Sequence, residues 1–247
     1  MEQTIFTNEI FISWLQYFSQ NVELNVTKLK MLDITGKNKN LIPTVMTNRA
    51  VLVFTDAGHP DIFYDMWNAE LGDCEVWYNE GSDPSGPIKH DKILSMINRG
   101  INASAAMLIL NPNAETNYQI GLENNRFSHG SVRYVCREVR AVIMNRLNLV
   151  DQDNLCIISG ESIAVEAAMF IAEGSVIAVE YDSKDRNTME ENIAKFGLNN
   201  VTVVESLDKG ILEPIPVPDK AFIVASPRID FEIKSLLAVN PNMEFVI

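Results

Sequence analysis

The stretch that decides the fold of this chain is an apolar run that ends in a short polar turn: Asn154-Leu155-Cys156-Ile157-Ile158-Ser159-Gly160-Glu161-Ser162. A helical pattern over Ser162–Ala172 follows it, and then a second apolar run, Ser175–Glu180. Two strands that are separated by a helix of this length pair in parallel, with a right-handed crossover. The stretch therefore predicts a strand–helix–strand unit.

The same alternation continues toward the C-terminus, and Gly197 stands where a helix C-cap glycine is expected. The further strands predicted are Val201–Val204, Lys220–Ala225 and Glu244–Ile247, and the further helices are Lys184–Phe196 and Ile229–Val239. Together they predict a Rossmann-like, doubly wound parallel sheet of order 3-2-1-4-5. The core residues predicted for this sheet are Val165, Met169, Ile177, Val179, Ile193 and Val203.

Upstream, the pattern also alternates, although less regularly. A helix is predicted over Arg137–Leu147, and before it lies a loop rich in Asn, Gly and Ser, Asn111–Tyr134, which we interpret as the domain boundary. The first half has strand-like runs at Lys28–Ile34, Ala50–Thr55, Cys74–Tyr78 and Ala105–Leu110, and helical patterns at Asn8–Ser19, His59–Glu70 and Lys89–Arg99. The predicted fold class is α/β, with a small mixed-sheet domain in residues 1–120 and a Rossmann-like domain in residues 121–247.

Composition excludes several classes of function. A net charge of −13 over 247 residues argues against a nucleic-acid partner, because phosphate binding needs a basic face. No apolar run approaches the roughly 20 residues of a membrane span, and no signal peptide is visible, so we expect a cytoplasmic protein. The three cysteines and three histidines lack metal-ligand spacing, so no metal site is predicted and each cysteine is expected to be a small buried residue. Oligomeric state is left open.

A ligand site is expected at the carboxyl ends of the central strands. Small residues in the turn after the first strand let backbone N–H groups and a helix N-terminus approach a ligand, which makes Ser159, Gly160, Glu161 and Ser162 candidates. Glu180 ends the next strand, where an acidic side chain accepts hydrogen bonds from ribose hydroxyls. A nucleotide-free domain in which Glu180 is merely exposed at a strand end is the alternative.

The second half resembles the decarboxylating cobalt-precorrin-6B C15-methyltransferases. The residues that carry the resemblance are Gly121-Leu122-Glu123, Phe127-Ser128-His129-Gly130, Arg137–Val142, Asn145–Leu147, Ala164–Ala168, Gly174–Glu180, Glu191-Asn192 and Phe196–Val201. The first half is similar to the second subdomain of the cobalt-precorrin-7 C5-methyltransferases, a tetrapyrrole methylase domain. That similarity rests on Leu52–Asp56, Pro60, Ile62 and Glu75–Glu80. Precorrin-6Y methyltransferases fuse these two units in this order.

The resemblance implies a methyltransferase of cobalamin biosynthesis that uses S-adenosylmethionine (SAM). The implied reaction methylates a corrin precursor at C5 and C15 and decarboxylates an acetate side chain. The resemblance also implies that Ser206 and Leu207, at the end of the third strand, lie where adenine is held. We nominate no general base and no other catalytic residue.

The chain departs from the family in the SAM loop. Where the family has an Asp and then three alternating glycines, this chain has Leu155, Ile157, Ser159 and Glu161, so that only Gly160 is a glycine. Side chains there hinder close backbone approach, and Glu161 adds a negative charge near the SAM carboxylate. SAM binding is therefore expected to be weak or lost. A catalytically degenerate paralogue that binds a tetrapyrrole or a partner protein is the second interpretation, and another nucleotide-binding α/β protein is the third.

Overall fold

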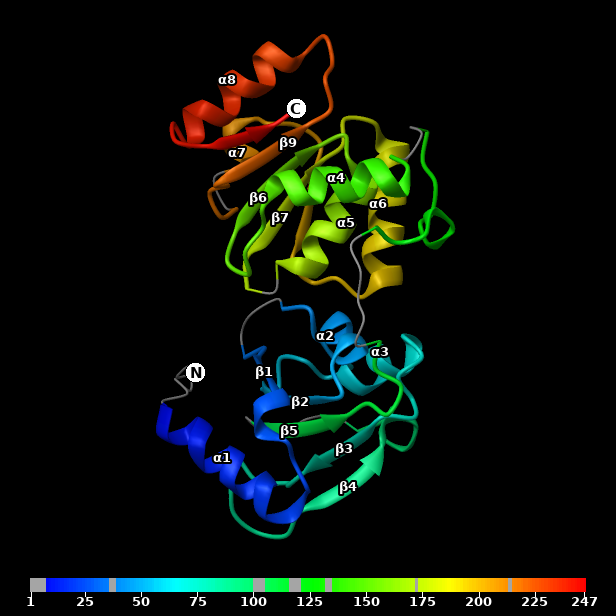
Figure 1. The fold of residues 1–247 in the computed structure, drawn as a ribbon, viewed down its shortest axis with the longest axis vertical. Coiled ribbons are helices and arrows are strands. Elements are labelled where there is room, and N and C mark those ends of the chain that lie inside the picture. The colour runs from blue at the N-terminus through cyan, green and yellow to red at the C-terminus, as the bar shows by residue number, and fades with distance from the viewer. Residues whose placement is uncertain are drawn as a thin grey trace. The chain divides into compact units, whose positions relative to one another are not determined.

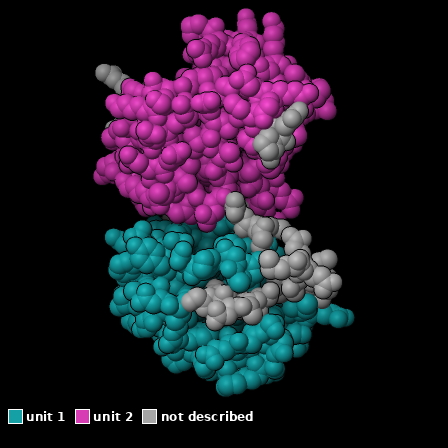
Figure 2. All heavy atoms as spheres, turned by 180° about the vertical axis from the view of Figure 1, so that it is seen from behind, with its two compact units in different colours: residues 1–118 teal, residues 119–247 magenta. Residues whose placement is uncertain are grey.

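The computed structural model describes residues 8–35, 39–99, 105–115, 121–131, 135–171, 173–212 and 215–247. The chain divides into two compact units, residues 1–118 and residues 119–247, and each is described by itself (Figures 1 and 2). The division falls within the loop Asn111–Tyr134. No helix among the described residues has the length and apolarity that a membrane crossing requires.

The first unit is a mixed α/β domain, as predicted. Its elements are α1 (Asn8–Asn21), the 3-10 helix η1 (Val26–Lys28), β1 (Lys30–Asp33), α2 (Leu41–Thr47), β2 (Ala50–Thr55), α3 (Ile62–Asn68), β3 (Glu75–Tyr78), β4 (Lys89–Lys92), η2 (Ile93–Ser95) and β5 (Ala105–Leu110). The sheet has the order β1-β2-β5-β3-β4, in which β1 and β2 are parallel and the other neighbours are antiparallel.

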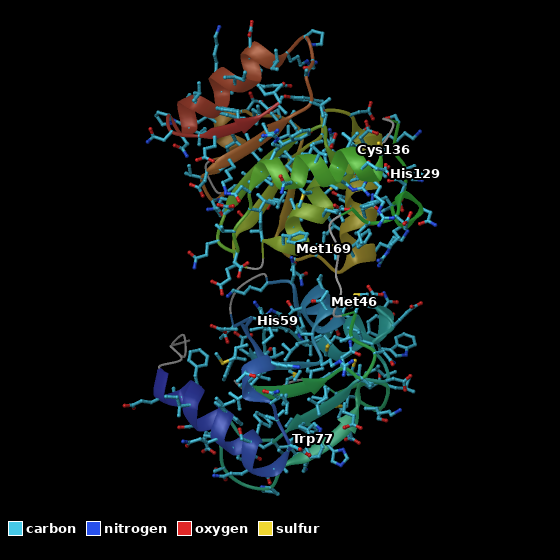
Figure 3. All side chains as sticks on the ribbon, viewed as in Figure 1. Met46, His59, Trp77, His129, Cys136 and Met169 are labelled. Atoms are coloured by element: carbon cyan, nitrogen blue, oxygen red, sulfur yellow. The ribbon has the colours of Figure 1, made fainter. Side chains whose placement is uncertain are left out.

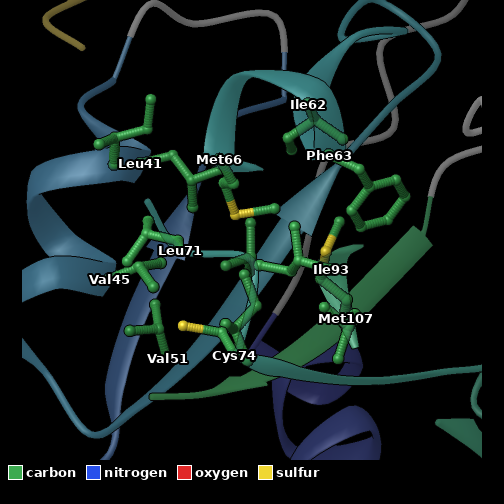
Figure 4. Close-up of a cluster of buried hydrophobic side chains, with 14 of the residues drawn as sticks. Leu41, Val45, Val51, Ile62, Phe63, Met66, Leu71, Cys74, Ile93 and Met107 are labelled. Atoms are coloured by element: carbon green, nitrogen blue, oxygen red, sulfur yellow. The ribbon is translucent and has the colours of Figure 1, made fainter. Parts of the chain in front are cut away.

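Strand β2 is buried on both faces and separates two cores. Its Val51 and Val53 pack with residues of α2, α3 and η2, a cluster that Figure 4 shows in part. Leu52 and Phe54 point to the opposite face, as the two-residue period of a strand requires. There they meet Trp14 and other residues of α1. The helical spacing of apolar residues over Asn8–Ser19 therefore predicted α1 correctly.

The helix predicted over Lys89–Arg99 is wrong. These residues form the edge strand β4 and the short η2 instead. Two buried residues three positions apart, Ile93 and Met96, imitate a helical stripe. The polar run that precedes them pairs antiparallel with β3, and charged side chains are usual on an edge strand.

The second unit confirms the predicted Rossmann-like sheet. Its elements are η3 (Asn124–Arg126), α4 (Arg137–Leu147), β6 (Asn154–Ile158), α5 (Glu161–Phe170), β7 (Ser175–Val179), α6 (Ser183–Phe196), β8 (Val201–Val204), α7 (Lys209–Leu212), β9 (Lys220–Ile223), α8 (Ile229–Val239) and β10 (Glu244–Val246). The strand order β10-β9-β6-β7-β8 is the predicted 3-2-1-4-5, and all neighbours are parallel. Gly197 caps α6 with a φ of 60°.

The core prediction for this unit is right in part. Val165, Ile177 and Val179 are buried. The structure leaves Met169, Ile193 and Val203 only partly buried, because the last turn of α5, the outer side of α6 and the edge strand β8 each keep one face open. In α6 the fully buried positions are occupied by Met189 and Asn192 instead.

The cysteine prediction is also right in part. Cys74 and Cys156 are buried, but Cys136 is exposed. Cys136 directly precedes α4 at its N-cap position, where the chain turns into the helix at the surface. Figure 3 labels Cys136 together with His59, His129 and Trp77. Within the described ranges, no three His, Cys, Asp or Glu side chains are grouped as metal ligands would be.

Candidate functional site at the carboxyl edge of the second sheet

The turn between β6 and α5 places Ser159 and Gly160 at the carboxyl edge of the sheet. Ser159 has a φ of 56°, a left-handed conformation that a residue with a Cβ adopts at some cost. Its N–H donates to the carbonyl of Val179 at 3.0 Å, so the contact between β6 and β7 continues into the turn. A Cβ on Gly160 would lie 2.7 Å from the Ile157 Cγ2 atom and 3.3 Å from the Phe222 ring. Gly160 thus permits close packing of the turn on the sheet.

Glu161 and Ser162 open helix α5. Ser162 is 2% exposed, so its side chain belongs to the interior. Glu161 is partly buried, and its Oε1 atom accepts a hydrogen bond from Asn192 on α6. Burial raises the pKa of Glu161 to about 7, with a further contribution from the nearby Asp185, while the hydrogen bond from Asn192 opposes the shift. The carboxylate therefore faces α6.

Glu180 follows β7 directly and is only 4% exposed. Its N–H donates to the carbonyl of Val204 at 3.0 Å, and its carboxylate forms no hydrogen bond to a described residue. Burial raises the pKa of Glu180 to about 7, and the negative charges of Asp185 and Glu161 add to the shift. An acceptor of this kind, buried and without a partner among the described residues, is suited to a ligand's hydroxyl groups.

The loop before α4 is bonded to α6 at the same edge. Ser131 donates to the Asp185 carboxylate from its N–H at 2.7 Å and from its hydroxyl at 2.5 Å. Ser128 and Asn192 exchange two hydrogen bonds, of 2.8 and 3.1 Å. A Cβ on Gly130 would lie 2.5 Å from the Asp185 Oδ1 atom and 3.4 Å from the Glu161 Oε2 atom. A side chain at position 130 would therefore displace the Asp185 carboxylate from its present position.

Ser206 and Leu207 do not join this group through any described contact. The Ser206 hydroxyl donates to the Asp208 carboxylate at 2.7 Å and accepts from the Asp208 N–H at 3.2 Å, which makes a local turn. Leu207 is 4% exposed and packs in the core on the α7 and α8 side of the sheet. An adenine-holding role for this pair stays a prediction.

Sequence reasoning missed the buried ion pair that fixes this loop. Arg140 on α4 and Glu166 on α5 are fully buried, with 2.8 Å between Arg140 Nε and Glu166 Oε1. Glu166 also accepts from the N–H groups of Gly121 at 3.2 Å and Leu122 at 2.5 Å. A glutamate inside the apolar run Ile163–Met169 was the available signal, since a buried carboxylate needs a partner.

A second missed group lies on the other face of the sheet. Tyr181, after Glu180, donates from its hydroxyl to the Glu232 Oε1 atom on α8 at 3.0 Å. The Arg228 guanidinium lies over the Tyr181 ring, 4.7 Å from its centroid. No pattern in the sequence pairs these residues, which are about fifty positions apart.

A parallel sheet of this order, with helices between its strands, defines a Rossmann-like domain. Residues 126–231 match the family model of the precorrin methyltransferase domain. The match lies within the second unit and covers less than half of the 247-residue chain. Comparison with curated proteins gives no match.

Several solved structures are similar to this chain. The precorrin-6Y C5,15-methyltransferase of Geobacter metallireducens GS-15 is 28% identical with a TM-score of 0.43, over 47% of this chain and 64% of that chain. The C-terminal domain of precorrin-6Y C5,15-methyltransferase from Rhodobacter capsulatus is 21% identical with a TM-score of 0.41, over 47% and 64%. The precorrin 8w decarboxylase of Methanobacterium thermoautotrophicum is 22% identical with a TM-score of 0.42, over 50% and 69%. All three TM-scores are below 0.5, so these likenesses carry no argument about function.

Proposed function

We propose that this protein is a SAM-dependent methyltransferase of cobalamin biosynthesis that acts on a corrin precursor. The observation that carries the proposal is the precorrin methyltransferase match over residues 126–231, the segment that contains Glu180 and the turn after β6. The specific reaction we propose is methylation at C5 and C15 with decarboxylation of an acetate side chain. The chain spans 64% of the Geobacter metallireducens protein's length, and the whole activity is therefore a proposal.

The adenosine half of SAM fits the residues present. Glu180 has acceptor oxygens without a described partner, at the strand end where ribose hydroxyls bind in Rossmann-like sheets. SAM, when bound, supplies an electrophilic methyl group on its sulfonium. The work of the chain's own residues would be to hold donor and acceptor in line, because orientation is a main source of rate acceleration in such reactions.

The carboxylate of SAM's methionine fits less well. Anions bind at a helix N-terminus, and here the first residue of α5 is Glu161. Its ionised form repels a ligand carboxylate, and the space beside Gly160 is filled by Ile157 and Phe222. We propose that SAM binds weakly for this reason.

The poor fit at Glu161 favours a second candidate function. A paralogue that has lost SAM binding would keep the buried core, the Arg140–Glu166 pair and the loop on α6, all of which are intact here. It would bind a tetrapyrrole or a partner protein without chemistry. A cytoplasmic location and the absence of a nucleic-acid partner stay predictions from composition.

Isothermal titration calorimetry of SAM, its demethylated product and adenosine separates the two candidates. We expect adenosine to bind the wild type and Glu161→Gln to tighten SAM severalfold while it leaves adenosine unchanged. Glu190→Gln, the same charge change at an exposed position of α6, is the control. Transfer of a labelled methyl group from SAM to a corrinoid acid then tests catalysis. If no adenosine compound binds either protein, the methyltransferase proposal is rejected and the non-catalytic candidate stands.

A further inference from the structure

Arg228, which follows β9, reaches past the carboxyl end of the central strand β6 to a residue that follows β7. The sheet order places β6 between β9 and β7, and Ile158 at the end of β6 pairs with Ile223 on one side and Val179 on the other. Arg228 follows β9 and Tyr181 follows β7, yet the Arg228 guanidinium lies 4.7 Å from the Tyr181 ring centroid. The contact therefore spans the carboxyl end of β6, next to the turn at Ser159.

The ring beneath Arg228 is fixed in place. The Tyr181 hydroxyl donates to Glu232 Oε1 at 3.0 Å, and Tyr181 packs against the core that β6, β7, β9 and α8 share. Glu232 is 1% exposed and lies one helical turn after Arg228 on α8. Its Oε2 atom has no hydrogen-bond partner in the described part of the chain. Because the buried Glu232 carboxylate accepts a hydrogen bond from the Tyr181 hydroxyl, it holds the tyrosine ring in one orientation.

Apart from its contact with the Tyr181 ring, the Arg228 guanidinium has no partner among the described residues. Its side chain is exposed and forms no ion pair with a described residue, although the chain has 33 acidic residues against 20 basic ones. Its backbone N–H donates to the Ser226 hydroxyl at 3.0 Å, which fixes the start of α8. When a guanidinium stacks on an aromatic ring, its N–H groups stay directed outward in one plane. Two of these N–H groups can donate hydrogen bonds to the two oxygens of a carboxylate.

Apolar side chains are exposed on the chain segments that flank Arg228. Val224, which directly follows β9, is 37% exposed, and Phe231, three residues after Arg228, is 55% exposed. A ligand that combines an apolar face with acidic groups at its rim is complementary to this arrangement. A tetrapyrrole with free acetate and propionate side chains has that chemistry, whereas a small carboxylic acid would leave the apolar side chains unused.

We propose that Arg228, stacked on Tyr181, is a specificity-determining residue that binds a peripheral carboxylate of a tetrapyrrole. This inference rests on the proposed function, because that function supplies the tetrapyrrole. Tyr181 and Glu232 are positioning residues in it.

The test is binding of two corrinoids to the full chain by absorption titration. Cobyrinic acid carries free peripheral carboxylates, and cobinamide presents amides on a ring of the same kind. We expect the wild type to prefer cobyrinic acid and Arg228→Gln to weaken that binding by about tenfold, the effect of losing one charge-assisted hydrogen bond. Cobinamide binding should not change. Lys234→Gln, the same charge change at an exposed position of α8, should leave both affinities unaltered.

The positioning role is tested at Tyr181. Tyr181→Phe keeps the ring under the guanidinium, and Tyr181→Leu removes it. We expect Tyr181→Leu to reduce the preference for cobyrinic acid more than Tyr181→Phe does. Equal loss of both corrinoids would indicate a merely structural effect and count against the role. Circular dichroism establishes that each variant is folded before it is titrated.

The outcomes separate this inference from the proposed function. If the wild type binds cobyrinic acid and Arg228→Gln binds it equally well, the inference is overturned while the proposed function stands. If Arg228→Gln weakens SAM alone, the carboxylate that Arg228 binds belongs to SAM and the assignment to the tetrapyrrole is overturned. If the wild type binds neither corrinoid, the proposed substrate class and the inference both fail, and SAM binding still reports on the methyltransferase site.

Discussion

Replacement of Glu166 by Gln tests what holds the loop of the second unit in place. The side chains of Glu166 and Arg140 are 1% and 0% exposed, and the negative charge of the Glu166 carboxylate compensates the positive charge of the Arg140 guanidinium. The carboxylate also accepts hydrogen bonds from the N–H groups of Gly121 and Leu122. Glutamine has nearly the same shape, so the substitution removes the charge and leaves the packing. The expected effect is therefore electrostatic.

The magnitude follows from the burial of the pair. Removing one member of a buried ion pair costs about 3–5 kcal/mol, because the remaining charge stays buried without compensation. Arg140 keeps its bonds to the carbonyls of Val135 and Leu122 and to Asn124. These neutral acceptors, and a glutamine oxygen in place of the carboxylate, offset part of the loss. We expect a destabilisation of about 3 kcal/mol, at the lower end of that range.

Urea denaturation followed by two probes localises the effect. The three tryptophans, Trp14, Trp67 and Trp77, all lie in the first unit, so their fluorescence reports on that unit. Circular dichroism at 222 nm reports on the helices of both units. We expect Glu166→Gln to shift a circular dichroism transition to lower urea and to leave the tryptophan transition in place.

Glu123→Gln is the matched control, because it breaks an ion pair with Arg137 in the same loop and helix. That pair is exposed, with 63% and 41% of the two side chains accessible. Exposed pairs contribute about 0–1 kcal/mol, so the control should shift the transition little. If Glu166→Gln is no more destabilising than Glu123→Gln, the argument from burial is refuted. A shift of the tryptophan transition alone would place the effect in the wrong unit.

Three further predictions concern the site and the chain as a whole. Glu161 and Glu180 have pKa values of about 7 in the folded protein, against an ordinary value of 4.5. Each therefore lowers the stability of the fold as the pH rises from 4.5 to about 7, and the full loss is present above pH 7. Glu180→Gln should therefore raise the melting temperature at pH 8 and change it little at pH 5, and an equal gain at both would contradict the assignment. Ser159→Gly should stabilise the protein by about 0.5–1 kcal/mol in chemical denaturation by relieving the left-handed backbone, whereas Ser162→Gly, in helical backbone, should destabilise it. Limited proteolysis should cut first within Asn111–Tyr134, and initial cleavage within Ser162–Glu180, identified by mass spectrometry, would contradict the domain prediction.

The sheet of the second unit was predictable because strands that are buried on both faces consist of consecutive apolar residues. Leu155–Ile158 within β6 and Val176–Val179 within β7 are continuous apolar runs. Because a helix connects them, the two strands can pair only in parallel. The edge strand β4 had no such signal, since its Lys89-His90-Asp91-Lys92 sequence is polar and its strand character comes from pairing with β3. Its conformation depends on a neighbour that is distant in sequence.

The candidate site was predictable only where it follows a strand end. Ser159 and Glu161 could be placed at the carboxyl edge because they lie in the turn after a predicted strand, and Glu180 because it ends the next predicted strand. Asp185 and Asn192 could not, since they act through hydrogen bonds to a loop more than fifty residues earlier. Ser162 and Leu207 were candidates by position, and their burial shows that a place near a strand end does not expose a side chain.

The side-chain alternation of β7 continues into the two residues that follow the strand, Glu180 and Tyr181. Glu180 and Tyr181 are consecutive, so their side chains point to opposite faces. Glu180 turns toward the α5 and α6 side, where the negative charges of Glu161 and Asp185 act on it. Tyr181 turns toward α8, where it supports the cation of Arg228. A ligand at this edge is therefore favoured when its cationic or hydroxyl groups lie on the first face, near Glu180, and its carboxylates lie on the second face, near Arg228. Under the proposed function, the ribose hydroxyls of SAM would therefore lie over the first face and a carboxylate of the tetrapyrrole over the second.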